Sequence, residues 1–315
     1  MRILFVKTSS LGDVIHHCPA VSDARRSLPG AEIDWVVEEP FAQIAALHPA
    51  VAKVLPVAVR RWRSRLSAPA AWGEMLAFRR ELRSRNYDIV IDAQGLVKSA
   101  LIASAARGAK HGYDAASARE PLASRFYDVR HPVPRAVHAV ERNRRLTAAA
   151  LGIQAGADCE YGLRLQADSP LPACGPYCVL LSMTSRPDKL WSEECWVGLV
   201  RALASRGLES ILPWGSKAEH ARALGIASAA RSGVVPPALE LLRLASLMQR
   251  AKAVFGLDTG LAHLAVALGV PTIGIFCGTD PALTGLYGTK LAMNLGGPGR
   301  APAVADALAA FERLS

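Results

Sequence analysis

The residues best suited to chemistry lie at turns where an apolar strand meets a helix. One such turn is Asp258-Thr259-Gly260, which follows an apolar run and precedes a small-residue helix predicted over 261–268. Asp and Thr are favoured helix N-cap residues, and the free backbone N–H groups at a helix N-terminus bind anions. This turn therefore predicts a site for the phosphates of a nucleotide.

Two more charged residues in the same half suit an activated nucleotide. Lys189 lies in the polar loop after a strand predicted over 177–181, and its positive charge suits a leaving diphosphate. Glu219 has two interpretations, as an acceptor of hydrogen bonds from a ribose diol or as an exposed glutamate of a helix. A transferase that uses an activated nucleotide fits these groups.

The first strand of the chain leads to a candidate base. Arg2 to Lys7 reads as a buried strand, and Asp13 begins the helix after the next turn. Asp13 is either a carboxylate that caps the helix or a general base that takes a proton from an incoming hydroxyl. The neighbouring Gly12 allows the close approach that a catalytic site needs.

A run of arginines follows in the same half of the chain. Arg60, Arg61, Arg63 and Arg65 surround Trp62 in a predicted loop before a helix at 70–85. Runs of like charge are commonly solvated faces, but arginines also clamp phosphate and carboxylate groups. Both interpretations stay open on the sequence alone.

The composition favours an anionic partner and two domains. The 315 residues include 37 Lys+Arg and 27 Asp+Glu, a net charge of +10, and 51% are apolar. Aromatic residues make up 6% and do not alternate with basic ones, so a phosphorylated substrate or an acidic membrane surface fits better than nucleic acid. A chain of this length can form two α/β domains.

Several classes of site are excluded or disfavoured. The six cysteines lack the spacing of a zinc site, so free thiols are expected and no metal site is predicted. The Walker A, G-x-G-x-x-G and G-x-S-x-G motifs are absent. Asp258-Thr259-Gly260 matches the aspartic-protease triplet, but that chemistry needs a second such carboxylate. We expect neither a signal peptide nor a membrane-spanning segment.

Strands and helices alternate in two series, separated by a Gly-, Ala- and Pro-containing stretch at 154–176. This predicts an α/β fold of two Rossmann-like β/α/β domains that face each other across a cleft. We expect an N-terminal domain at 1–165, a C-terminal domain at 166–300, and an amphipathic helix in 301–315 that packs back on the first domain. His111-Gly112-Tyr113 reads as a basic loop.

The chain resembles the lipopolysaccharide heptosyltransferases of glycosyltransferase family 9 from end to end. The SSLGDV and AQGLVKS segments look more like the heptosyltransferase I branch than the heptosyltransferase II branch. The resemblance rests on VKTSSLGDVIH (Val6 to His16), DWVVEEPFAQI (Asp34 to Ile44), VAVRRWR (Val57 to Arg63), YDIVIDAQGLVKSA (Tyr87 to Ala100), AREPLAS (Ala118 to Ser124), LPWGS (Leu212 to Ser216) and LDTGLAHLAVALGVPTIGIF (Leu257 to Phe276).

The resemblance implies the GT-B fold and transfer of L-glycero-D-manno-heptose from ADP-heptose to Kdo of Kdo2-lipid A, with inversion, in inner-core synthesis. It implies a cytoplasmic, metal-independent enzyme, peripheral on the cytoplasmic face of the inner membrane, without nucleic acid or a required protein partner. The implied residues are Asp13 as base, Thr184, Lys189, Glu219, Asp258, Thr259, Gly260 and His263 for the donor, and Arg60, Arg61, Arg63, Lys98 and Arg119 for the acceptor.

Two alternatives stay open. A nucleotide-sugar epimerase uses the same two-domain fold without a lipid acceptor. Such an enzyme has no need of the arginines at 60–65, so these argue against it. The other alternative is a non-catalytic protein that binds an ADP-sugar or lipid A. In such a protein, replacing Asp13 with alanine would change nothing, because neither ligand is turned over.

Overall fold

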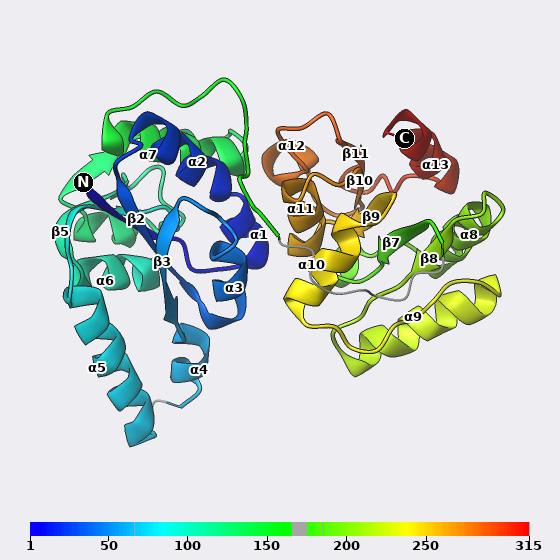
Figure 1. The fold of residues 1–315 in the computed structure, drawn as a ribbon, viewed down its shortest axis with the longest axis horizontal. Helices are drawn as coiled ribbons and strands as arrows, with labels where there is room; N and C mark the ends of the chain where they lie inside the picture. Colours follow the sequence, from blue (N-terminus) through cyan, green and yellow to red (C-terminus); the bar gives the residue numbers. More distant parts are fainter. Residues whose placement is uncertain (66, 166–174, 185, 315) are drawn as a thin grey trace. The chain divides into compact units, whose positions relative to one another are not determined.

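The computed structural model describes residues 1–65, 67–165, 175–184 and 186–314. The chain divides into two compact units, Met1–Arg164 and Leu165–Ser315, so the division falls beside the predicted boundary at 165/166. Each unit is a parallel β-sheet with helices packed around it (Figure 1). The predicted α/β architecture of two Rossmann-like domains is confirmed.

The first unit contains a parallel sheet in the order β3-β2-β1-β4-β5-β6. Residues 3–6 of the central strand β1 are fully buried, as expected for an apolar strand with both of its faces covered. The elements are β1 Arg2–Val6, α1 Leu11–Ile15, α2 Cys18–Ser27, β2 Glu32–Glu38, η1 Glu39–Phe41, α3 Ala42–Ala45, β3 Val51–Val57, α4 Val59–Arg63, α5 Pro69–Arg83, β4 Asn86–Asp92, α6 Val97–Ala105, β5 Arg107–Tyr113, η2 Pro121–Phe126, β6 Val129–His131 and α7 Ala139–Leu151.

The second unit contains a parallel sheet in the order β11-β10-β9-β7-β8. Its three central strands β7, β9 and β10 are buried along their whole length. The elements are β7 Tyr177–Leu181, η3 Pro187–Lys189, α8 Glu193–Ala204, β8 Glu209–Ile211, α9 Lys217–Ala230, α10 Leu241–Gln249, β9 Ala253–Leu257, α11 Gly260–Ala267, β10 Thr272–Phe276, α12 Pro281–Thr284, β11 Ala292–Gly296 and α13 Val304–Leu314.

The expected loop at His111-Gly112-Tyr113 is the end of strand β5, so this expectation was wrong. The strand itself has few apolar residues, and the apolar contacts along it come from tyrosines of other segments. Gly112 lies against the ring of Tyr127, where a Cβ atom would come within 2.3 Å of a ring carbon. A glycine at this position therefore lets the tyrosine pack over the strand.

Three residues of the arginine run expected in a loop, Arg60, Arg61 and Arg63, lie in the short helix α4. Its Trp62 is buried in the core of the first unit, and the Trp62 indole N–H donates to Glu74 of α5 over 2.8 Å. Burial of one large aromatic residue explains why a strongly basic segment is helical here.

The apolar face of the C-terminal helix α13 is buried in the core of the second unit. It contacts α8, β10 and β11. Ala307, Ala310 and Phe311 are buried in that core, and the Phe311 ring lies 5.9 Å from that of Phe255 on β9. This helix therefore supports the strand that leads to Asp258.

No helix in the described ranges is both long and apolar enough to cross a membrane. The cysteines within those ranges carry free thiols, as the spacing predicted, namely Cys18, Cys159, Cys178, Cys195 and Cys277.

Replacing Phe311 with alanine should lower the free energy of unfolding of the second unit by about 3–5 kcal/mol, because it leaves a cavity beside Phe255. Calorimetric or urea-induced unfolding would measure the loss. Arg313→Ala, on the exposed side of the same helix, is the matched control and should change stability by less than about 0.5 kcal/mol. If both changes lowered the free energy of unfolding equally, the packing of Phe311 against Phe255 would contribute little to stability.

Candidate active site

A buried carboxylate shapes the loop that follows β4. Asp92 accepts hydrogen bonds from the backbone N–H groups of Gln94 (2.8 Å) and Gly95 (3.2 Å) and from the hydroxyls of Ser99 (2.8 Å) and Tyr127 (2.7 Å). Burial raises the pKa of Asp92, and these hydrogen bonds oppose the rise. Together they fix the position of Gln94.

Gln94 in turn joins this loop to the loop after β1. Its side-chain oxygen accepts from the backbone N–H groups of Thr8 (3.1 Å) and Ser9 (3.3 Å). Strands β1 and β4 are parallel neighbours, so their carboxyl-end loops lie side by side. Lys98 of α6 reaches the same place and donates to the Ser9 hydroxyl over 3.3 Å.

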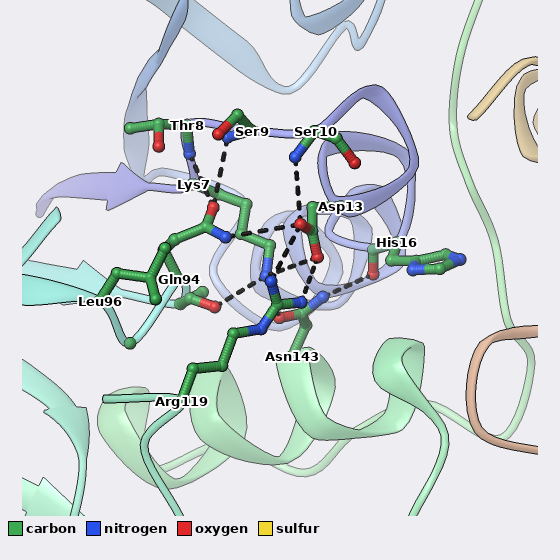
Figure 2. Close-up of polar contacts among 12 residues, drawn as sticks. Lys7, Thr8, Ser9, Ser10, Asp13, His16, Gln94, Leu96, Arg119 and Asn143 are labelled. Atoms are coloured by element: carbon green, nitrogen blue, oxygen red, sulfur yellow. Dashed lines mark hydrogen bonds and ion pairs between the residues drawn. The ribbon is translucent and has the colours of Figure 1, made fainter. Parts of the chain in front are cut away.

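Asp13 lies in the centre of this group (Figure 2). Its carboxylate accepts from the Ser10 backbone N–H over 3.0 Å, so it does cap its own helix. The Arg119 guanidinium contacts both oxygens, at 2.5 Å to Oδ1 and 3.2 Å to Oδ2, and the Lys7 ammonium lies 3.7 Å from Oδ1. The Gln94 amide completes the group at 3.5 Å from Oδ2. Capping and a second role for Asp13 are therefore compatible.

The charges around Asp13 decide its protonation state. Burial raises the pKa of Asp13, but the charges of Lys7 and Arg119 outweigh burial and hold the pKa well below its usual range. Burial also lowers the pKa of Lys7 to about 8, although Asp13 opposes this. Asp13 is therefore an ionised carboxylate at neutral pH, in a site with a net positive charge.

Sequence reasoning predicted Asp13, Lys98 and Arg119, and the structure brings these three to one edge of the sheet. It missed Lys7 and Gln94. The Lys7 ammonium donates to the Ala93 carbonyl over 2.9 Å, which holds it beside Asp13. The signal for both residues was available, since each lies at or near the carboxyl end of a predicted strand.

The arginines of α4 are arranged differently. Arg61 is held by two acids, with contacts of 2.6 Å to Glu74 and 2.9 Å to Glu39, and Arg60 lies over the Phe41 ring at 5.9 Å. Arg63 is exposed. No contact between these arginines and Asp13 is found among the described residues, so they form a separate basic surface of the first unit.

The second unit has its own group of charged residues at the carboxyl ends of β9 and β10. The Lys189 ammonium lies 2.6 Å from Oδ2 of Asp258, the Thr279 hydroxyl donates to the same oxygen over 2.7 Å, and His263 Nε2 lies 3.9 Å from Oδ1. Burial raises the pKa of Asp258, but hydrogen bonds from these three side chains lower it below its usual range. Thr279 was missed by sequence reasoning.

The backbone beside this group suits an anion. Thr259 is the N-cap of α11, yet its hydroxyl does not cap the helix. The Thr259 hydroxyl and that of Ser182, at the end of β7, are buried without a hydrogen-bond partner among the described residues. Buried hydroxyls without partners are costly, and a ligand that bonds to them removes the cost. With Gly260 opening the helix, this turn can receive a phosphate.

Thr184 and Glu219 do not join this group. The part-buried Glu219 carboxylate accepts from the Gly215 backbone N–H over 2.6 Å at the start of α9. Thr184 forms no hydrogen bond with another described residue. Within the described ranges, no cluster of three or more His, Cys, Asp or Glu side chains is arranged to hold a metal.

Comparison with known proteins identifies the family. The profile of glycosyltransferase family 9 (heptosyltransferase) matches residues 75–306. Lipopolysaccharide heptosyltransferase 1 of Escherichia coli K12 is 47% identical over 91% of this chain and 91% of its own length. The same-named protein of Pseudomonas aeruginosa is 48% identical over 91% of this chain and 82% of its own.

The solved structures agree. The structure of E. coli heptosyltransferase WaaC with ADP has a TM-score of 0.92 and 43% identity, covering all of both chains. The same enzyme with ADP-2-deoxy-2-fluoro heptose has a TM-score of 0.89, with 42% identity and full coverage of both chains. The fold is the GT-B fold expected from the resemblance, and the chain belongs to glycosyltransferase family 9, the heptosyltransferases.

Proposed function

We propose that this enzyme transfers L-glycero-D-manno-heptose from ADP-heptose to the Kdo of Kdo2-lipid A, with inversion, in lipopolysaccharide inner-core synthesis. The observation that carries the proposal is the ionised Asp13 held among cations in the first unit. The family of the chain and its 47% identity to lipopolysaccharide heptosyltransferase 1 support the choice of substrates.

The second unit would bind the donor. The N-terminus of α11 and the Thr259 hydroxyl offer hydrogen bonds to the diphosphate, and Lys189 offers a positive charge. Lys189 is now paired with Asp258. The diphosphate of the donor would compete with Asp258 for the Lys189 ammonium. The ammonium would then stabilise the negative charge that develops on the diphosphate as ADP leaves.

The first unit would bind the acceptor and supply the base. An acceptor hydroxyl attacks the anomeric carbon of heptose on the face opposite to ADP. Its oxygen forms the new glycosidic bond while the bond from that carbon to the phosphate oxygen breaks, and Asp13 takes the hydroxyl proton. Arg119 now occupies both oxygens of Asp13. The Kdo carboxylate is the natural competitor for this guanidinium, so acceptor binding would free the base.

The two alternatives are not favoured. A putative UDP-N-acetylglucosamine 2-epimerase from Listeria monocytogenes shares the fold at a TM-score of 0.54, but its 14% identity supports no common activity. The relatives with close to half of their residues identical are all heptosyltransferases by name. A non-catalytic binding protein would not need an ionised carboxylate held between Lys7 and Arg119.

The remaining expectations belong to the same proposal. The enzyme works in the cytoplasm, peripheral on the cytoplasmic face of the inner membrane, without a catalytic metal, nucleic acid or an obligatory protein partner. The net charge of +10 supports attraction to an anionic surface. Lys189 and the α11 N-terminus supply the positive potential that a metal gives to other transferases.

The direct test is ADP release from purified protein mixed with ADP-heptose and de-acylated Kdo2-lipid A, in excess EDTA. Release that needs both substrates and survives EDTA supports the transferase and its metal independence. Release that stops in EDTA and returns with a divalent cation would refute metal independence alone. Absence of release under every condition would refute the proposed reaction.

Replacing Asp13 with asparagine should lower kcat by about 100- to 10,000-fold, the usual contribution of a general base. The amide keeps the shape of the side chain, and the donor groups in the second unit are untouched. Binding of ADP-heptose, measured by calorimetry, should therefore be unchanged. Turnover close to that of the parent would remove Asp13 from the base role.

Replacing Arg119 with alanine should move the acidic limb of the pH profile of kcat/KM to higher pH. Arg119 helps to hold the pKa of Asp13 low, so Asp13 would become protonated at a higher pH without it. The value of kcat/KM should also fall, by about tenfold or more, through loss of an acceptor contact. Arg125→Ala, at an exposed arginine of η2, is the matched control. If the acidic limb did not move, Arg119 would not be what lowers the pKa of Asp13.

Replacing Lys189 with methionine should weaken ADP-heptose binding by about tenfold to a hundredfold, because a charge-assisted contact to phosphate is lost. Calorimetry measures this without turnover. Lys252→Met removes the same charge at the amino end of β9, the opposite end from Asp258, and should leave affinity unchanged. Equal losses in both variants would indicate a general charge effect.

A further inference from the structure

Helix α5 presents an unusual outer face. One side carries the core contacts, through buried Ala71 and Leu82 and through Met75 and Phe78. A neighbouring, solvent-exposed side carries two large apolar residues, with Trp72 55% exposed and Leu76 56% exposed. The N-terminal end of the helix, which holds Trp72, extends beyond the strands of the first sheet in Figure 1.

Arginines continue the same face. Trp72, Leu76, Arg79, Arg80 and Arg83 follow the i, i+4, i+7, i+8 and i+11 spacing that places residues on one side of a helix. We call these five residues the outer face of α5. Apolar side chains occupy its N-terminal half and guanidinium groups its C-terminal half.

The acids of the helix do not offset this charge. Glu74 lies on a flank of α5 and pairs with Arg61 at 2.6 Å, and Glu81 pairs with Lys53 at 2.9 Å. Neither acid shares the outer face, and none of its three arginines forms an ion pair with another described residue. The outer face is therefore both apolar and purely cationic.

The arginines also border a hollow. A groove of about 720 Å³ is lined by Gly73, Leu76, Arg79, Arg80, Arg83 and Arg107, the last from the start of β5. Four guanidinium groups around one groove can each form bidentate hydrogen bonds to phosphate oxygens. Gly73 leaves room beside the Leu76 side chain, since nothing lies within 4 Å of its missing Cβ.

We propose that the outer face of α5 docks on an anionic phospholipid bilayer. Trp72 and Leu76 enter the boundary between head groups and acyl chains, and the arginines bind lipid phosphates in the groove. A cationic helix face with Trp and Leu is the pattern of interfacial helices that lie on a membrane. This inference rests on the proposed function, because it presents the enzyme to an acceptor anchored in that bilayer.

A bilayer fits this face better than a soluble polyanion does. Exposed Leu76 gains nothing from RNA or from free phosphate, but it gains burial at an acyl boundary. The arginines alone fit either class of partner. Both apolar residues and all three arginines should therefore contribute to binding.

The test is co-sedimentation of the full chain with phosphatidylcholine vesicles, with and without phosphatidylglycerol. The parent should bind only the anionic vesicles, and less so at high salt. The triple variant Arg79→Ala, Arg80→Ala and Arg83→Ala should bind about a hundredfold more weakly, because each basic residue near such a surface contributes about a factor of five. The double variant Trp72→Ser and Leu76→Ser should lose about tenfold or more.

Matched controls separate this inference from the proposed reaction. A triple variant at Arg243, Arg250 and Arg313, exposed residues of the second unit, removes the same charge and should still bind. All variants should turn over the de-acylated acceptor at the parental rate, while the outer-face variants turn over the vesicle-bound lipid acceptor more slowly. Normal turnover of the soluble acceptor also establishes that a variant is folded.

Three results would overturn the inference. Failure of the parent to bind anionic vesicles would exclude the bilayer. Equal binding by the outer-face variants and the control would place the contact elsewhere. Displacement of vesicles by millimolar glycerol phosphate would indicate a site for a soluble phosphate.

Discussion

The position of the candidate base, Asp13, depends on the carboxylate of Asp92, which is fully buried. Asp92 holds the loop after β4 through four hydrogen bonds, and that loop places Gln94 against the backbone after β1. The position of Asp13 is thereby set by contacts between segments far apart in sequence. A parallel sheet permits this, because its loops at one edge are neighbours in space even when about eighty residues separate them in the chain.

Both units contain a largely buried carboxylate that stays ionised beside a cation. Each places a carboxylate, Asp13 or Asp258, against a cation at the carboxyl edge of its sheet. Neighbouring charges hold the pKa of Asp13 low despite burial, and hydrogen bonds from neighbouring side chains do the same for Asp258. The pairs Arg119–Asp13 and Lys189–Asp258 also keep each cation in place before a ligand arrives. Under the proposed function, an anionic ligand would have to displace the internal partner of Arg119 or Lys189, which would favour ligands with enough charge to compete.

Much of this arrangement was predictable from the sequence, and the failures have physical causes. Apolar runs and helix-capping residues identified the central strands and the turns that carry Asp13 and Asp258. Strand β5 was missed because its sequence, RGAKHGY, is rich in Gly and basic residues, and the ring of Tyr127 from another segment packs against Gly112. The apolar stripe of helix α13 predicted a packed helix but could not say that it joins the core of the second unit, because a stripe does not identify its partner. Thr279 was missed because only the fold brings it to Asp258, whereas Lys7 ends a predicted strand and could have been found.

The contact between Arg119 and Asp13 has a consequence for the donor sugar. An activated sugar is vulnerable to hydrolysis whenever a base beside it can accept a proton from water. With both of its oxygens held by a guanidinium, Asp13 is a poor acceptor for such a proton. Under the proposed function, an acceptor whose own carboxylate draws the guanidinium away would be needed to free Asp13, so the enzyme without its acceptor would not use Asp13 to hydrolyse the donor.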